Sequence, residues 1–235
     1  MTCIIVLAYN KIDVTKQFLT QLFDNTYKNY HLVIVDNGST DGTAEFLDQI
    51  DRDNVHIISL DYNSGVIDGR NIGYERSKHL DYDYLLFLDN DQFVEKEWLE
   101  QHIDFMKDGG YDVLGVEAWK MSDNFRPINM VVSPTGPFTY VGAGGMIIKR
   151  NVVEKIGLFD LGFSPMYFED PDFCFRCNKN GFYFGWNPYA KLTHNPHQTM
   201  SIISQEDKHK YFRKSLSYFR EKWEGYQPTT YKRTE

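Results

Sequence analysis

Continuous apolar runs alternate with amphipathic stretches along the first half of this 235-residue chain. The apolar runs have the length of strands and occupy residues 3–9, 31–36, 55–60 and 84–89. The stretches that follow them have apolar residues at helical spacing and occupy residues 13–24, 43–50, 66–79 and 95–107. Uninterrupted apolar strands that alternate with helices indicate βαβ units, whose parallel sheet is covered on both faces. We therefore predict an α/β fold with a mostly parallel central sheet flanked by helices.

The pattern becomes less regular after about residue 110. The further elements expected there are strands at 112–119, 144–150 and 190–196, and helices at 151–157 and 169–181. No internal repeat, low-complexity tract or linker divides the chain. We predict one domain over residues 1–204, in two halves at 1–110 and 111–204, and a C-terminal amphipathic helix and tail at 205–235.

Charge and cysteine content exclude several classes of protein. A net charge of −8 argues against nucleic-acid binding, which depends on positive charge that neutralises phosphates. Three cysteines do not make a disulfide framework. No basic segment that would suit a secretory signal opens the sequence, and no apolar run reaches the roughly 18 residues of a membrane helix. We therefore predict a cytoplasmic protein with no transmembrane segment.

Polar residues collect where the four apolar runs end. Ala8, Tyr9 and Asn10 end the first run, Asp36 ends the second, and Asn63 follows the third. The fourth run ends at Asp89. In open α/β sheets, ligands bind beyond the carboxyl ends of the strands. Asp and Asn are also common turn residues, so each alone is a weak signal, but four such ends together indicate a binding site.

Asp89-Asn90-Asp91 places two carboxylates two positions apart at a strand end. Strand geometry puts alternate residues on the same side of the chain, with Asn90 on the other side, where it should tolerate substitution. Two carboxylates on one side can share a hard divalent cation through their oxygens. The alternative is a turn with solvated carboxylates.

A second acidic cluster, Glu169-Asp170-Pro171-Asp172, follows the aromatic residues Tyr167 and Phe168. Proline suits the first turn of a helix, and acidic side chains there complement the helix dipole. The cluster is therefore explained as the start of a helix. The functional alternative is that one of its carboxylates is a general base.

Together, these motifs resemble family 2 glycosyltransferases of the GT-A fold. The segments that carry the resemblance span roughly residues 1–200: residues 2–10, VIVDNGSTDGT, NSGVIDGRNIG, LFLDND, GAGGMIIKR and YFEDPDFCFR. The chain is most similar to single-domain, rhamnosyltransferase-like members, because the Gln-x-x-Arg-Trp signature of processive synthases is absent. The resemblance implies a Rossmann-like, mixed central sheet, with a nucleotide-binding half at 1–110 and an acceptor and catalytic half at 111–204.

The resemblance also implies an inverting transfer of a sugar from a nucleotide diphosphate donor of UDP, dTDP or GDP type, with Mn²⁺ or Mg²⁺. Asp170 matches the catalytic base, with Glu169 as the fallback. The metal ligands would be Asp89, Asp91 and His194. The residues that match the donor site are Ala8, Tyr9, Asn10, Asp36, Asn63, Arg70, Asp89 and Asn90. Gly144, Gly145 and Phe168 match the region near the sugar and acceptor.

Some features depart from the family pattern or lie outside it. Asp68 stands where relatives usually have a small apolar residue, and we expect it to cap the following helix. No specific motif occurs at 120–141, where acceptors usually bind, so the acceptor is a glycan or a lipid-linked glycan of unspecified kind. Cys174 and Cys177 are expected to be small core hydrophobes rather than metal ligands.

The C-terminal helix expected at 206–226 carries an apolar stripe. Its members at helical spacing are Phe212, Leu216, Phe219 and Trp223. We expect the stripe to pack on the domain or on the second copy in a homodimer. The lysines and arginines around it also suit peripheral contact with the inner face of a membrane, near a lipid-linked acceptor.

Two rival functions are a catalytically inactive GT-A domain that binds nucleotide or glycan, and a sugar-1-phosphate nucleotidyltransferase. The nucleotidyltransferase should carry a glycine-rich basic loop after its first strand, and AYNKIDVTK contains no glycine. The inactive domain is weakened by the presence of Asp89, Asp91, Asp170 and His194 together.

Overall fold

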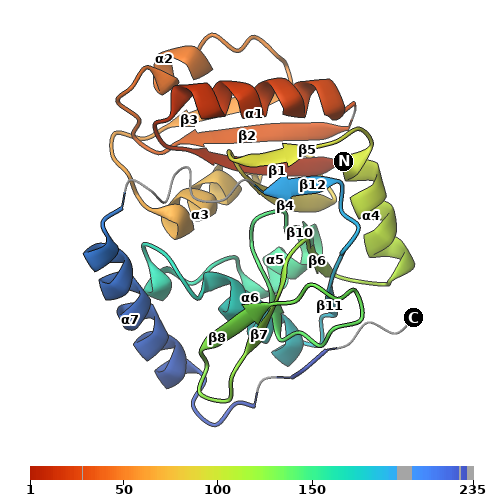
Figure 1. The fold of residues 1–235 in the computed structure, drawn as a ribbon. Coiled ribbons are helices and arrows are strands. Elements are labelled where there is room, and N and C mark those ends of the chain that lie inside the picture. The colour runs from red at the N-terminus through yellow and green to blue at the C-terminus, as the bar shows by residue number, and fades with distance from the viewer. Residues whose placement is uncertain (28, 195–202, 228, 232–235) are drawn as a thin grey trace.

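A computed structural model describes residues 1–27, 29–194, 203–227 and 229–231. Its centre is a seven-stranded sheet in the order β11-β6-β10-β4-β1-β2-β3 (Figure 1). These strands are β1 (Thr2–Ala8), β2 (Tyr30–Asp36), β3 (Val55–Ser59), β4 (Tyr84–Asp89), β6 (Val113–Gly115), β10 (Ile147–Lys149) and β11 (Phe184–Trp186). Four of the six strand pairs run parallel, and the other two join β10 antiparallel to its neighbours β4 and β6. The predicted mixed, mostly parallel sheet is confirmed.

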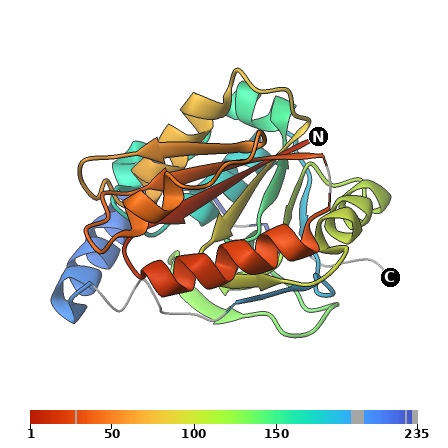
Figure 2. The ribbon, with the colours of Figure 1, turned by 90° about the horizontal axis from the view of Figure 1, so that it is seen from above.

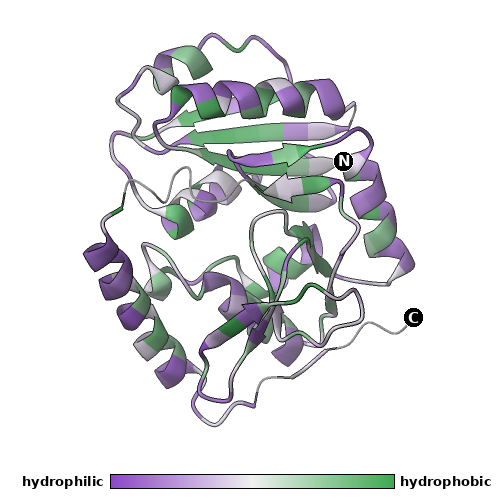
Figure 3. Ribbon diagram, viewed as in Figure 1, coloured by the Kyte–Doolittle hydropathy of each residue, from purple (hydrophilic) through white to green (hydrophobic). Residues whose placement is uncertain are grey.

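Helices cover both faces of this sheet. The helices of the described residues are α1 (Ile12–Asn25), α2 (Thr43–Leu47), α3 (Val66–Ser77), α4 (Trp98–Asp108), α5 (Arg150–Ile156), α6 (Glu169–Lys179) and α7 (Gln205–Lys222), with a 3-10 turn, η1 (Leu161–Phe163). Figure 2 shows α1 on one side of the strands and α3 and α5 on the other. The strands are the most continuously apolar segments, whereas the outer helices carry polar residues on their exposed sides (Figure 3).

The alternation of side chains along β1 divides the core into two layers. Ile4 and Val6 belong to the layer that contains Phe18 of α1, and Ile5 belongs to the layer that contains Ile67 of α3. Successive side chains of a strand point to opposite faces, so a strand buried on both faces must be apolar throughout. This explains why β1, β2 and β4 read as nearly continuous apolar runs, whereas β3, at the edge of the sheet, is only partly buried.

Two small sheets, β12-β5 and β8-β7-β9, accompany the central sheet, and all of their strands except β5 come from the second half of the chain. Their strands are β5 (Gln92–Val94), β7 (Ala118–Met121), β8 (Pro127–Met130), β9 (Tyr140–Val141) and β12 (Leu192–His194). The strand predicted at 112–119 is in fact two strands of different sheets. The chain leaves the central sheet at Gly115, where a β-carbon would lie only 2.5 Å from Cβ of Val141. The short strands β5, β8, β9 and β11 were not predicted.

The apolar stripe of α7 packs on the domain itself. Leu216, Phe219 and Trp223 are buried and belong to the core layer that contains Phe173 and Phe175 of α6. The packing expectation is therefore correct, and these three side chains are not available to a second subunit or to a membrane. A homodimer or a membrane contact through α7 stays a prediction that would have to use its exposed residues.

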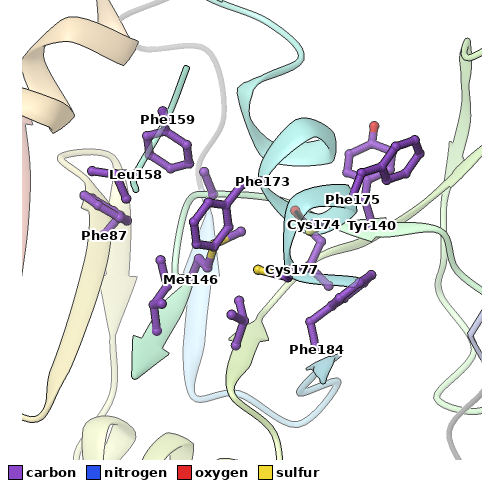
Figure 4. Packing of buried hydrophobic residues seen from close by; sticks show 14 of the residues in the cluster. Phe87, Tyr140, Met146, Leu158, Phe159, Phe173, Cys174, Phe175, Cys177 and Phe184 are labelled. Carbon is purple, nitrogen blue, oxygen red and sulfur yellow. Dashed lines mark hydrogen bonds between the residues drawn. The ribbon is translucent and has the colours of Figure 1, made fainter. Parts of the chain in front are cut away.

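Cys174 and Cys177 are free thiols inside the core, as expected. In Figure 4 both lie among aromatic side chains and Met146, on the inner side of α6. Burial raises the pKa of the Cys177 thiol to about 12, so this thiol stays protonated and inert.

Candidate active site

An open cavity of about 590 Å³ lies at the carboxyl ends of β1 and β4. The start of α3, the start of α6 and the three-stranded sheet β8-β7-β9 complete its walls. The residues that line it are Leu7, Tyr9, Asn37, Asn63, Gly65, Val66, Arg70, Asp89, Asn90, Asp91, Gln92, Glu117, Trp119, Pro127, Tyr140, Gly142, Ala143, Gly144, Met166, Tyr167, Phe168, Glu169, Asp170, Pro171, Ile203 and Phe212. The fold therefore brings both predicted acidic clusters to one cavity.

Three of the predicted donor residues do not line this cavity. The Ala8 side chain is fully buried in the core. Asn10 accepts a hydrogen bond at its Oδ1 from the Thr40 amide at 2.8 Å, and Asp36 accepts one at its Oδ1 from the Ser39 amide at 3.2 Å. These two side chains shape the loop after β2. A contact between the donor and Ala8, Asn10 or Asp36 stays a prediction.

Asn37 organises the loop that leads into α3, and no sequence motif predicted this role. It is 4% exposed, and its Nδ2 donates to Oδ1 of Asn63 and to the Gly65 carbonyl, each at 3.1 Å. Its Oδ1 accepts from the Ser64 amide and hydroxyl, each at 2.8 Å. The Asn37 amide thus donates two hydrogen bonds and accepts two, and these bonds fix Asn63, a predicted donor-binding residue, at the cavity wall. Its position directly after Asp36 was the only signal in the sequence.

Arg70 is the cation that links the two acidic clusters. It is 4% exposed, its Nη2 donates to Oδ1 of Asp89 at 2.6 Å, and its Nη1 lies 3.7 Å from Oε1 of Glu169. The guanidinium also lies over the Phe87 ring, 5.7 Å from its centroid. A planar guanidinium with several donors can serve two carboxylates at once, which a lysine cannot do in the same way.

Asp89 and Asp91 both line the cavity, although β4 ends at Asp89 and the next two residues form a turn. The Asp89 amide donates to Oε1 of Gln92 at 2.9 Å. Gly144 packs against this pair, since a β-carbon there would lie 2.7 Å from Oδ2 of Asp89. Only glycine fits this position without displacing the carboxylate.

Asn90 is held in place by α1. It is 3% exposed, and its Nδ2 donates to the Thr15 hydroxyl at 3.1 Å. The Asn90 side chain reaches Thr15 of α1 whereas Asp89 reaches Arg70 of α3, so these two side chains diverge as expected, although Asn90 also lines the cavity. The tolerance expected of Asn90 does not follow, however, because a buried amide that loses its partner is costly.

The described residues contain no group of three or more His, Cys, Asp or Glu side chains that could hold a metal by themselves. Mg²⁺ and Mn²⁺ commonly bind through one or two carboxylates together with phosphate oxygens, so the pair Asp89 and Asp91 fits a cation shared with a ligand. The backbone of His194 in β12 pairs with Gln92 of β5, which places this residue beside the same turn. The His194 side chain lies outside the described part of the chain.

Glu169 and Asp170 occupy the first turn of α6, as the helix-start interpretation predicted. Burial raises the pKa of both carboxyls. The charge of Glu169 raises the pKa of Asp170 further, whereas the Arg70 guanidinium opposes both shifts. Burial and the nearby Asp170 charge also raise the pKa of Tyr140 well above its usual range. The pair is therefore set up to hold a proton rather than a fixed charge.

Two buried polar atoms at the cavity have no partner among the described residues: Nε2 of Gln92 and Oε2 of Glu169. One is a donor and the other is an acceptor. Buried polar groups are nearly always hydrogen-bonded in complete sites, so these two atoms mark positions where a polar ligand would bind.

A row of side chains crosses the three-stranded sheet toward Asp170, and no motif predicted it. Trp119 of β7 pairs with Met130 of β8 on one side and with Tyr140 of β9 on the other. Directly opposed residues share a face of the sheet, and this face carries Trp119 and Tyr140 at the cavity. The row runs from Met130, which is 43% exposed, to the buried Tyr140.

The remaining predicted residues are placed as follows. Phe168 and Gly144 line the cavity, whereas Gly145 lies behind it, where its carbonyl accepts from Nε2 of His102 at 3.2 Å. Asp68 does not cap α3, because the N-cap residue is Gly65. The Asp68 carboxylate instead accepts a hydrogen bond from the Ser164 hydroxyl, next to η1.

Among solved structures, the chain is similar to GalNAc-T7 with UDP, GalNAc and Mn²⁺, with a TM-score of 0.70 and 16% identity over 83% of this chain and 43% of the other. It is also similar to residues 1–349 of S. aureus TarS in complex with UDP-GlcNAc, with a TM-score of 0.59 and 20% identity over 89% of this chain and 64% of the other. Both likenesses concern the fold, which is the GT-A fold.

Relatives at the level of sequence include the putative teichuronic acid biosynthesis glycosyltransferase TuaG of Bacillus subtilis, 31% identical over 60% of this chain and 55% of the relative. The glycosyltransferase AglE of Haloferax volcanii is 29% identical over 66% of this chain and 51% of the relative. The chain thus spans about half the length of these curated relatives. The model of "Glycosyl transferase family 2" matches residues 3–173, which is most of the chain. The protein therefore belongs to glycosyl transferase family 2.

Proposed function

We propose that this protein is an inverting glycosyltransferase that moves a sugar from a nucleotide diphosphate donor to a hydroxyl of a glycan or lipid-linked acceptor. The observation that supports the proposal most is the single cavity that has Asp89 and Asp91 in one wall and Asp170 in the other. Inverting transfer needs this arrangement, because the acceptor hydroxyl must attack the sugar from the side opposite the leaving diphosphate.

Asp170 is the proposed general base. The acceptor oxygen forms a bond to the anomeric carbon, the bond from that carbon to the diphosphate oxygen breaks, and the hydroxyl proton passes to the Asp170 carboxylate. Burial and the charge of Glu169 raise the pKa of Asp170, which makes its carboxylate a stronger proton acceptor than a solvated aspartate. A positioned base of this kind contributes roughly 10²–10⁴ in rate.

Asp91, Asp89 and His194 are the proposed ligands of Mn²⁺ or Mg²⁺. When bound, such a cation would offset the negative charge that develops on the diphosphate. Asp89 gives one of its oxygens to Arg70, so Asp91 is the more direct ligand in this proposal. One similar solved structure contains Mn²⁺ together with UDP, which supports a divalent metal here as well.

The donor is proposed to be a UDP, dTDP or GDP sugar, and UDP is the nucleotide named for both similar solved structures. Tyr9, Asn63 and Arg70 line the part of the cavity near the strand ends, where the nucleotide and diphosphate would lie. Nε2 of Gln92 and Oε2 of Glu169 would then bind hydroxyls of the donor sugar, which can both accept and donate.

The acceptor is proposed to reach Asp170 along the row formed by Met130, Trp119 and Tyr140. An indole beside a polar cavity offers a flat apolar surface for a sugar ring. A role in polysaccharide synthesis agrees with the teichuronic acid biosynthesis named for TuaG. Among the described residues, no helix has both the length and the apolar character needed to cross a bilayer. A cytoplasmic location, near the inner face of a membrane, stays a prediction.

A thermal-shift screen of UDP-, dTDP- and GDP-sugars with Mn²⁺ or Mg²⁺ tests donor and metal together. A ligand at one hundred times its Kd adds about 2.7 kcal/mol to the stability of the native state, so the right donor should raise the melting temperature most. Asp91→Ala should remove the metal-dependent part of that shift. Asp104→Ala, an exposed aspartate of α4 outside the cavity, is the matched control and should keep it.

Turnover then separates the proposed activity from its rivals. The best donor should be hydrolysed slowly in water and transferred faster to a suitable acceptor, with release of the nucleoside diphosphate. A thermal shift without any turnover would favour the inactive binding domain. Formation of pyrophosphate from a nucleoside triphosphate and a sugar 1-phosphate would favour the nucleotidyltransferase. If a full shift persists in Asp91→Ala, the assignment of the metal site is wrong.

A further inference from the structure

The backbone that enters α6 is held in an unusual conformation directly before the proposed base. Tyr167 and Phe168 have φ values of 74° and 71°. Two successive aromatic residues in the left-handed region are costly, at roughly 1–3 kcal/mol each, and persist only where the surroundings hold them. The next two residues are Glu169 and Asp170, so this conformation sets the direction of both carboxylates.

Hydrogen bonds from α7 hold the carbonyls of this segment. Ser215 is fully buried, and its hydroxyl lies 3.0 Å from the Met166 carbonyl and 3.3 Å from the Phe163 carbonyl, within reach of donation to either. Lys214 donates from Nζ to the Ser164 carbonyl at 2.8 Å. Two adjacent residues of α7 therefore supply the donors for carbonyls of the segment that runs from Phe163 to Met166.

Aromatic rings of α7 hold the side chains of the same segment. The Phe168 ring lies 5.4 Å from the Phe212 ring and 5.2 Å from the Phe219 ring, measured between centroids. The Tyr167 ring lies 5.8 Å from the Phe212 ring. Contacts at these distances favour one arrangement of the rings, and thus one arrangement of the backbone that carries them.

The end of α7 holds the far side of the same helix start. Asp172 is fully buried, accepts a hydrogen bond from Nε1 of Trp223 at 2.9 Å and forms an ion pair with Nζ of Lys222 at 2.7 Å. Contacts from α7 thus bracket Glu169 and Asp170, at Phe168 before them and at Asp172 after them. α7 lies wholly outside the segment that matches the family model, residues 3–173.

We propose that α7 is the element that positions the proposed catalytic carboxylates, and that Ser215 is a positioning residue for Asp170. The inference rests on the proposed function. Ser215 touches neither donor nor acceptor in this proposal and acts only through the backbone at Met166. Its loss should let the Tyr167–Phe168 segment relax and move Asp170 away from the acceptor hydroxyl, where a misplacement of about 1 Å can cost roughly 10² in rate.

Ser215→Ala is compared with Ser217→Ala, the same change at an exposed site on the same helix. The substrate is the donor that the thermal-shift screen selects, with water as the acceptor. Ser215→Ala should lower kcat roughly tenfold to a hundredfold, while KM for the donor and Kd for its nucleoside diphosphate stay within about twofold. Ser217→Ala should change none of these. Unchanged kcat in Ser215→Ala, or an equal loss in Ser217→Ala, overturns the proposal.

Hydrogen exchange of the peptide that spans residues 166–172 gives a readout that needs no turnover. Ser215→Ala should speed exchange there and leave the strand peptides of β1 and β4 unchanged. If the wild type turns over no donor, the proposed function fails, while this measurement still tests whether α7 holds the segment before Asp170 in place. Unchanged exchange overturns the proposal in either case. If Ser215→Ala does not fold, Lys214→Met, at an exposed site, should show the same pattern with a smaller loss.

Discussion

The two walls of the cavity handle negative charge in opposite ways. In the wall made by the strand ends, Asp89 pairs with Arg70 at 2.6 Å and its side chain remains 33% exposed. In the wall made by α6, Glu169 is only 10% exposed, and its distance to the same guanidinium is 3.7 Å. The first wall therefore holds a partly hydrated carboxylate in a close ion pair, whereas burial in the second wall raises the pKa of its two carboxyls.

This difference teaches how one cation can serve two purposes. A close, partly hydrated ion pair stabilises fixed charge, as the binding of a metal and a diphosphate requires. A buried carboxyl beside a like charge and at a longer distance from the cation gains proton affinity, as a general base requires. The distance of a carboxylate from Arg70 and the depth of its burial therefore decide whether it suits metal and diphosphate binding or general-base catalysis.

Asp170→Asn should have the largest effect on activity. Loss of the proton acceptor should lower kcat roughly 10²–10⁴-fold with little change in donor affinity. The same variant should be more stable than the wild type, because it removes a buried charge. The raised pKa of Asp170 fixes the sign: wild-type stability falls as pH rises from the unfolded pKa through the folded one, so the gain in melting temperature should grow with pH.

Steady-state kinetics and thermal melts between pH 4 and pH 8 measure both effects. A variant with full activity would remove Asp170 from the mechanism. A variant that is inactive but less stable than the wild type at every pH would contradict the inference that the α6 wall raises the pKa of Asp170 by burial.

Arg70→Gln should weaken both walls at once. Asp89 and Glu169 would lose their shared cation, at a cost of roughly 1–3 kcal/mol, since Asp89 keeps part of its hydration. The pKa of Asp170 should rise further, because Arg70 lowers it in the wild type. Loss of activity on acidification should therefore begin at a higher pH. Arg76→Gln, an exposed arginine of the same helix, is the control and should leave the pH profile unchanged.

Glu169→Gln should shift the pH profile in the other direction. The negative charge of Glu169 raises the pKa of Asp170, so its removal should let Asp170 stay ionised to lower pH. The acidic limb of kcat against pH should move down, and donor KM should rise if Oε2 of Glu169 binds the sugar. A limb that moves upward, or does not move, would show that Glu169 does not act on the base through its charge.

Asn90→Ala should have the smallest effect and should act on stability. The Thr15 hydroxyl would lose its partner inside the protein, at a cost of about 1–3 kcal/mol. Chemical denaturation should show this loss with an unchanged slope, and Asn90→Ala with Thr15→Ala should lose less than the sum of the single changes. An additive double variant would mean that the hydrogen bond contributes nothing.

Much of the strand-end wall could be predicted from sequence because it depends on local patterns. Apolar runs mark β1, β2 and β4, and the polar residues at their ends must meet at one edge of a parallel sheet. Asp89 and Asn63 were found in this way, whereas Arg70, which lies in α3, was identified through the family resemblance. Asn37 was not, because its role depends on four hydrogen bonds to a loop that follows a different strand.

The α6 wall could be predicted only in part. Its acidic cluster was identified from the residues, and the choice of Asp170 as the base came from the family resemblance. The short strands of two to four residues carry too little pattern to be recognised. Trp119 and Tyr140 become part of the cavity only once β7 pairs with β9. Asp68 was misassigned for a similar reason, since its partner Ser164 is distant in sequence.

The packing of one side of α7 on the core means that the segment that matches the family model and the folded unit do not have the same boundary. The stretch that is recognisable by descent ends at Asp172-Phe173, in the middle of a helix, while Phe219 packs on Phe168 and Phe175 as one cooperative unit. A chimera joined at residue 173 would exchange the whole segment that matches the family model, but its junction would divide one aromatic cluster between two parent proteins. Recombination within this family should therefore succeed only at junctions that transfer α6 and α7 together, so that the helix that bears the carboxylates and the helix that supports it are inherited as a pair.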